Sequence, residues 1–293
     1  MMESPRLLVI ACAILTACSH GSAAPSGRLV SIGSHSLEIR ETGEGAPVVV
    51  IDSGLGDDLE KLRPLQDAIG SVTRVVTYNR AGYGRSEPGP LPRDCGREAE
   101  ELKALLDSAS VPGPYILVGH SLGALNVQVF ASRYPNSVAG LILLDPPPRP
   151  FILGREFVDL RAMAERMTAE WQTIADSSAD STDPAERARA GFFRMLASEH
   201  REMFGATARL IEGISTFGDL PLVVVASGKP NPAFGEAAGK FQHFWIEQSR
   251  GLAGLSSRGR FELAEGATHS ALVDEQELVK KSVLSMVRQA RAK

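Results

Sequence analysis

Residues 119–123, with the sequence GHSLG, have the residue types and spacing that suit covalent chemistry. A serine hydroxyl attacks a carbonyl carbon when the backbone exposes it and a neighbouring base takes its proton. A sharp turn from a strand into a helix provides the exposure, because it holds Ser121 in a strained backbone conformation. A side chain at position 119 or 123 would crowd that turn, which explains the two glycines. The pattern predicts a nucleophile at Ser121, beside a helix N-terminus that favours negative charge.

The elements that must position this serine are short apolar runs that alternate with helical patterns. Continuous Val/Ile/Leu-rich runs are typical of strands buried on both faces of a parallel sheet, and their alternation with helices predicts an α/β fold. Ligands bind outside the carboxyl ends of such strands, so the loops at that edge matter most. We expect strands at 28–32, 36–40, 47–52, 73–78, 115–118, 138–144, 222–226 and 260–264, and helices at 57–69, 97–108, 122–134, 236–252 and 275–290.

One segment breaks the alternation after the sixth predicted strand. Residues 146–217 contain two long helical patterns and no convincing strand. The second pattern starts at Asp183-Pro184, a pair that suits the N-cap and first turn of a helix. We therefore expect a helical cap at 146–217, inserted into a core that consists of 28–145 and 218–293.

With these elements in place, the chain resembles the α/β-hydrolase superfamily from residue 28 to residue 293. GHSLG matches the family's nucleophile elbow, and the insertion matches its cap or lid. The sequence YNRAGYGRS at 78–86 is similar to the family's D-R-x-G-x-G-x-S segment, with Asn79 in place of the usual Asp. The resemblance implies a mostly parallel, doubly wound sheet and a serine hydrolase that needs no metal or organic cofactor.

The resemblance also implies the positions of the base and the oxyanion hole. The family's catalytic His follows the last strand, where this chain has His269 in the sequence EGATHS. By the logic of the triad, Ser121 attacks, His269 takes and returns the proton, and a carboxylate fixes the His tautomer. The amide of Leu122 and that of Leu55, in the loop after the third strand, are the expected oxyanion donors.

The acid of this triad has more than one candidate. In most of the superfamily the acid follows the strand expected at 222–226, but the next residues, GKPNPAFG, contain no Asp or Glu. Asp145 ends the sixth strand, from which haloalkane dehalogenases and certain lipases in the superfamily take their acid. We expect Asp145 to be the acid, although an Asp there can also simply cap the strand or anchor the cap. Glu236 is the main alternative, and Asp57 and Asp58 are more distant ones.

The N-terminus has the features of an export signal. An apolar run, LLVIACAILTA, follows one Arg and is too short to span a bilayer comfortably. It ends in LTAC at 15–18, which resembles the lipobox of bacterial lipoproteins, whose Cys becomes the lipidated first residue. We expect a signal peptide at 1–18, lipidation of Cys18, a linker at 19–27 and an envelope location, anchored to a membrane and facing the periplasm. An ordinary secretory signal cleaved near 22–24 is the alternative.

Composition limits the partners of the protein. The 293 residues include 31 Lys and Arg against 35 Asp and Glu, mixed along the chain without a basic stripe, so nucleic acid is not an expected partner. Cys95 is the single cysteine after the signal, so we expect no disulfide within the folded domain and a thiol without a catalytic role.

Two functions from different classes follow from these patterns. The first is a serine hydrolase that cleaves a small carboxylic ester, or a related acyl bond, through an acyl-enzyme intermediate. The second is a non-catalytic envelope protein that binds a ligand or a partner, which the absence of an acid from GKPNPAFG suggests. Peptide, lactone and thioester substrates would use the same machinery, and the fold does not separate them.

Overall fold

The computed structural model describes residues 27–270 and 275–292. The predicted signal peptide at 1–18 with Cys18, and linker residues 19–26, lie outside the described residues, so lipidation and export stay predictions. In the part of the chain that the structure describes, no helix is both long enough and apolar enough to cross a membrane.

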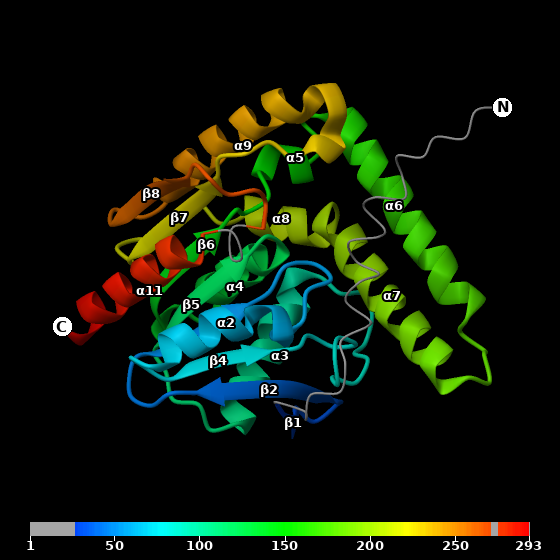
Figure 1. The fold of residues 1–293 in the computed structure, drawn as a ribbon, viewed down its shortest axis with the longest axis horizontal. Helices are drawn as coiled ribbons and strands as arrows, with labels where there is room; N and C mark the ends of the chain where they lie inside the picture. Colours follow the sequence, from blue (N-terminus) through cyan, green and yellow to red (C-terminus); the bar gives the residue numbers. More distant parts are fainter. Residues whose placement is uncertain (1–26, 271–274, 293) are drawn as a thin grey trace.

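In the described residues, eight strands form one twisted sheet in the order β1-β2-β4-β3-β5-β6-β7-β8 (Figure 1). The β1–β2 and β2–β4 pairs are antiparallel, and every other pair is parallel. The prediction of an α/β fold with a mostly parallel sheet is therefore confirmed. The strands are β1 (Arg28–Ser31), β2 (Ser36–Thr42), β3 (Val48–Asp52), β4 (Val75–Tyr78), β5 (Tyr115–His120), β6 (Val138–Leu144), β7 (Leu222–Ser227) and β8 (Gly259–Ala264).

Helices cover both faces of this sheet (Figure 1). Successive strand residues point to opposite faces. Val49 and Ile51 of β3 thus pack with α2 and α11, whereas Val50 packs with α3, α4 and α9. Full burial of each such side chain contributes about 1.5–3 kcal/mol, which makes the sheet a firm base for the loops at its edges. These helices are α2 (Leu59–Gly70), α3 (Cys95–Ser108), α4 (Leu122–Arg133), α9 (Ala238–Ala253) and α11 (Gln276–Arg291).

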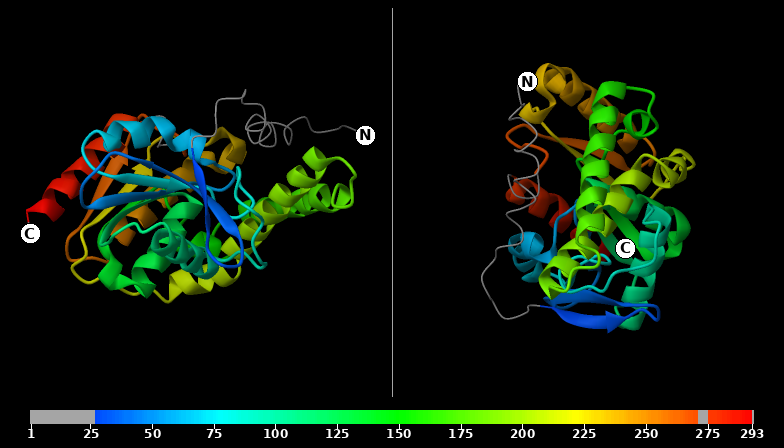
Figure 2. Two further views of the ribbon diagram at one scale, coloured as in Figure 1. Left: turned by 90° about the horizontal axis from the view of Figure 1, so that it is seen from below. Right: turned by 90° about the vertical axis from the view of Figure 1, so that its right-hand side faces the viewer.

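The segment between β6 and β7 is helical, as the sequence predicts. Its two long helices pack against each other through Trp171, Phe193 and Leu196, and the pair projects from the body of the molecule (Figure 2). Two short helices were not predicted, because four and seven residues are too few to show a periodic pattern. The four helices are α5 (Arg149–Ile152), α6 (Val158–Ser177), α7 (Pro184–Met203) and α8 (Ala206–Glu212).

Two predicted helices begin two residues away from the expected position. The helix expected at 236–252 is α9, but it begins at Ala238, because a 3-10 segment, η3 (Pro232–Ala237), precedes it and Gly235, at a φ of 55°, interrupts the helical path there. The helix expected at 97–108 is α3, which begins earlier, at Cys95, since the Asp94 side chain accepts hydrogen bonds from the amides of Gly96 and Arg97 as an N-cap. The Cys95 thiol is buried, and burial raises its pKa well above the ordinary value, so it stays protonated.

Candidate active site

Ser121 occupies the turn between β5 and α4, with a φ of 52° and a ψ of −117°. This left-handed backbone is one that a side-chain-bearing residue rarely adopts. A Cβ on Gly119 would lie 2.4 Å from the carbonyl oxygen of Gly123, and a Cβ on Gly123 would lie 2.4 Å from that of Asp52. Both glycines are therefore required for the turn, for the reason that the sequence pattern indicated.

The structure brings His269 between Ser121 and Asp145. The Nε2 atom of His269 lies 2.9 Å from Oγ of Ser121, and its Nδ1 atom lies 2.6 Å from Oδ2 of Asp145. The three residues come from the carboxyl ends of β5 and β6 and from the loop after β8. Parallel strands place those ends at one edge of the sheet, so residues far apart in sequence meet there. The contacts allow a proton to move from Ser121 to His269 while Asp145 orients the imidazole.

Asp145 is held by the end of the neighbouring strand, β7. The residue is 1% exposed, with Oδ1 accepting from the amide of Ser227 at 2.9 Å and Oδ2 accepting from Oγ of Ser227 at 2.9 Å. Gln242 on α9 in turn donates to the carbonyl oxygen of Ser227 at 2.7 Å. The hydrogen bonds from Ser227 hold the carboxylate of Asp145 so that it faces His269.

Sequence reasoning missed Ser227 and Gln242. A signal was present, because Ser227 ends the strand whose following loop holds the acid in most of the superfamily.

Of the alternative acids, Glu236 lies exposed on η3. Asp57 pairs with Lys61 at 2.7 Å, and Asp58 caps α2, so neither takes the place of Asp145 beside Nδ1 of His269.

The loop after β3 lies against the nucleophile turn. A Cβ on Gly54 would stand 2.9 Å from Nδ1 of His120, the residue before Ser121. Leu55, the predicted first oxyanion donor, follows Gly54 in this loop, and Leu122, the predicted second donor, begins α4. Both therefore belong to backbone segments that border Ser121.

The buried side chain of Arg80 binds the backbone of the loop after β3. Its guanidinium donates to the carbonyl oxygens of Ser53 at 2.8 Å and Gly54 at 2.9 Å. The same group pairs with Asp52 at 2.8 Å and with Glu199 of α7 at 3.1 Å. Burial alone would lower the pKa of Arg80, but Glu199 and then Asp52 raise it well above its usual value. Arg80 belongs to the segment at 78–86 that resembles the family's D-R-x-G-x-G-x-S motif, but its link to the cap could not be seen in the sequence.

His120 supports the backbone of His269. The carbonyl oxygen of His269 lies 2.7 Å from Nε2 of His120 and can only accept, so this nitrogen donates. Burial, and then the neighbouring His269, lower the pKa of His120 to about 4. A neutral His120 thus fixes the loop that carries His269.

In the described ranges, no three His, Cys, Asp or Glu side chains gather as metal ligands would.

Comparison with known proteins agrees with the fold and with the resemblance in the sequence. The model of the "Alpha/beta hydrolase family" matches residues 48–281. The "Uncharacterized protein YqjL" of Bacillus subtilis (strain 168) is 24% identical over 238 residues, which cover 81% of this chain and 82% of that protein.

Two proteins named as a hydrolase and a lactonase are also similar to the chain. The 2-(acetamidomethylene)succinate hydrolase of Mesorhizobium japonicum is 28% identical over 152 residues, 52% of each chain, so the match spans about half of that protein. The crystal structure of the enol-lactonase from Burkholderia xenovorans LB400 superposes with a TM-score of 0.63 at 20% identity, covering 89% of this chain and 100% of that one. The chain thus belongs to the alpha/beta hydrolase family and is an enzyme of the hydrolase type.

Proposed function

We propose that the protein is a serine hydrolase that cleaves a small carboxylic ester or a related acyl bond. The observation that supports this most is the pair of contacts made by His269, 2.9 Å to Oγ of Ser121 and 2.6 Å to Oδ2 of Asp145. A nucleophile, a base and an orienting acid in that order are the requirements of acyl transfer through a covalent intermediate. Membership of a hydrolase family favours this enzyme over the non-catalytic binding protein considered from the sequence.

In the first half of the proposed reaction, Oγ of Ser121 attacks the carbonyl carbon of the ester while Nε2 of His269 takes the hydroxyl proton. The amides of Leu55 and Leu122 stabilise the negative charge on the former carbonyl oxygen. The intermediate then expels the alcohol, which receives the proton from His269. In the second half, a water molecule gives a proton to His269 and attacks the acyl-enzyme, and the acid leaves as Ser121 regains its proton.

The aromatic side chains beside His269 suggest an apolar acyl group. The Trp245 ring lies 5.4 Å from that of His269, and Phe241 lies 5.4 Å from Trp245. Phe151 and Phe157, at the start of the cap, pack on Phe241 at 5.0 and 4.8 Å. This series of mostly buried rings links the cap to the base, so an acyl group bound beside His269 would meet apolar side chains.

A fluorophosphonate probe tests the proposal, because it reacts with an activated serine. We expect a covalent adduct that peptide mapping places on Ser121, and loss of p-nitrophenyl ester hydrolysis in proportion to labelling. A series of esters with graded acyl chains, run in parallel, measures the size of the acyl site. A folded protein that hydrolyses the esters without an adduct at position 121 would contradict the proposed nucleophile.

The buried pair of Arg80 and Glu199 gives a second prediction. In Glu199→Gln, Arg80 loses one counter-charge, and Tyr83, whose hydroxyl donates to Glu199 at 2.7 Å, loses a charged acceptor. We expect the loop that carries Leu55 to shift. Because complete loss of one oxyanion donor costs roughly a hundred- to a thousand-fold, a shifted donor should lower kcat by about tenfold with little change in KM.

Glu170→Gln is the matched control, because Glu170 is an exposed residue of α6 in the same cap. It should leave both kinetic constants near those of the unmodified protein. If Glu199→Gln lowers the melting temperature but leaves kcat unchanged, Arg80 and Glu199 serve stability alone and do not position the loop.

A further inference from the structure

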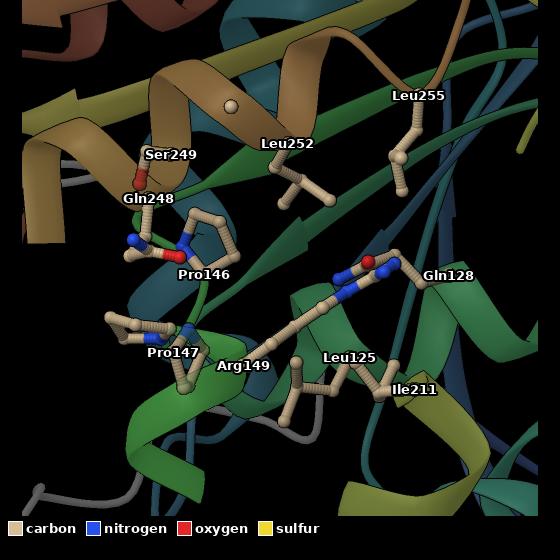
Figure 3. Close-up of a pocket in the computed structure, with 12 residues that line it drawn as sticks. Leu125, Gln128, Pro146, Pro147, Arg149, Ile211, Gln248, Ser249, Leu252 and Leu255 are labelled. Atoms are coloured by element: carbon tan, nitrogen blue, oxygen red, sulfur yellow. The ribbon is translucent and has the colours of Figure 1, made fainter. Parts of the chain in front are cut away.

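A pocket of about 150 Å³ lies between α4 and α9, beside the prolines that follow Asp145 (Figure 3). Most of its wall is apolar, yet the Arg149 side chain extends across it from the start of α5 toward Gln128 of α4. The residues that line it are Leu125, Gln128, Pro146, Pro147, Pro148, Arg149, Ile211, Gln248, Ser249, Gly251, Leu252 and Leu255.

Arg149 is a cation without a counter-charge in this pocket. Its Nη1 atom donates to the carbonyl oxygen of Ile214 at 2.9 Å. Its Nε and Nη2 atoms are buried and have no hydrogen-bond partner within residues 27–270 and 275–292. Burial lowers the pKa of Arg149, and no acidic side chain in those ranges offsets the effect. A guanidinium stays protonated in proteins, so its charge would attract an anionic ligand to this pocket.

Among the residues that line this pocket, two further polar atoms are buried without a partner in the described part of the chain. Gln128 is 1% exposed and donates its amide to the carbonyl oxygen of Ala124 at 2.9 Å, but its Oε1 atom accepts from no described residue. Ser249 is 2% exposed, and its Oγ atom is likewise unpaired. The nitrogens of Arg149 and Oγ of Ser249 can donate, and leaving such buried donors unpaired is unfavourable, so they indicate a ligand that accepts hydrogen bonds.

We propose that this pocket binds a short aliphatic carboxylate. The two unpaired nitrogens of Arg149 are adjacent members of a planar fork that matches the two oxygens of a carboxylate. Ser249 can donate a further hydrogen bond. Leu125, Ile211 and Leu252 offer apolar surface to an alkyl chain, which phosphate and sulfate lack. The volume holds a few heavy atoms beyond the carboxylate, so acids such as butyrate fit better than long fatty acids.

The site is distinct from the Ser121 turn and does not rest on the proposed ester hydrolysis. Isothermal titration calorimetry with sodium butyrate, at constant ionic strength, tests it on the full-length protein. We expect saturable one-to-one binding that is weakened by more than about tenfold in Arg149→Gln, because a charge-assisted bidentate contact is lost. Ser249→Ala should retain the fold and weaken binding by about tenfold, through the loss of one hydrogen bond to a charged group.

Arg155→Gln is the matched control, since the side chain of Arg155 is exposed and pairs with the exposed Glu212. Butyrate affinity in this variant should equal that of the unmodified protein. Binding should also persist in protein whose Ser121 has been labelled by fluorophosphonate, which shows that the site is separate from the nucleophile. The proposal is overturned if no saturable binding occurs, if Ser249→Ala and Arg149→Gln bind as the unmodified protein does, or if labelling of Ser121 abolishes binding. Phosphate binding as tight as butyrate binding, and equally dependent on Arg149, would overturn the assignment to carboxylates.

Discussion

Replacing Ser121 with Ala is expected to lower kcat for ester hydrolysis by roughly a million-fold, the loss seen when the nucleophile of a serine hydrolase is removed. His269 would still stand in place, but no atom would remain to form the acyl-enzyme. Residual activity above the uncatalysed rate would come from substrate binding and the oxyanion donors alone. The fold should change little, because within residues 27–270 and 275–292 Oγ of Ser121 hydrogen-bonds only to Nε2 of His269, and the loss of one hydrogen bond costs about 1 kcal/mol.

The measurement is the steady-state hydrolysis of p-nitrophenyl esters by purified protein, with circular dichroism to confirm folding. Ser132→Ala is the matched control, because Ser132 is exposed on the same helix, α4. It should retain full activity. Turnover by Ser121→Ala within tenfold of the unmodified protein would show that the nucleophile lies elsewhere.

Replacing Asp145 with Asn is expected to lower kcat by roughly ten-thousand-fold, as the same change does in a serine protease. The reason lies in the contacts of Asp145. One carboxylate oxygen accepts from the amide of Ser227, and the other accepts from Oγ of Ser227 and from Nδ1 of His269. In Asp145→Asn the NH₂ group would replace one of these two oxygens. It would then face a group that also donates, either the amide of Ser227 or Nδ1 of His269. The imidazole would then lose its orientation and its preferred tautomer.

Glu236→Gln separates the two acids that the sequence left open. Glu236 is exposed on η3, so this change should leave kcat and KM within about twofold, as expected for surface substitutions. The rate of fluorophosphonate labelling should follow the same order as kcat, which distinguishes lost activation of Ser121 from lost substrate binding. If Glu236→Gln slows labelling and Asp145→Asn does not, Glu236 is the acid and the assignment of Asp145 is wrong.

The sequence determined the features that depend on neighbouring residues. The strand, turn and helix around GHSLG are contiguous, so the turn at Ser121 could be predicted from its two glycines. The mostly parallel sheet followed from alternating apolar runs and helical patterns. His269 was identified by its place after the last strand, and Asp145 by elimination and by its place at the end of β6, because strand ends share one edge of the sheet.

The tertiary structure decided what depends on contacts between distant segments. Ser227 and Gln242 hold Asp145, and Arg80 reaches Glu199, but no local pattern shows which side chains will meet across two elements. The pocket at Arg149 could not be predicted for the same reason, because the residues that line it come from four separate parts of the chain. Backbone geometry in a tight turn is fixed by the few residues that form it, whereas the pairing of buried polar groups is fixed by the packing of the whole domain.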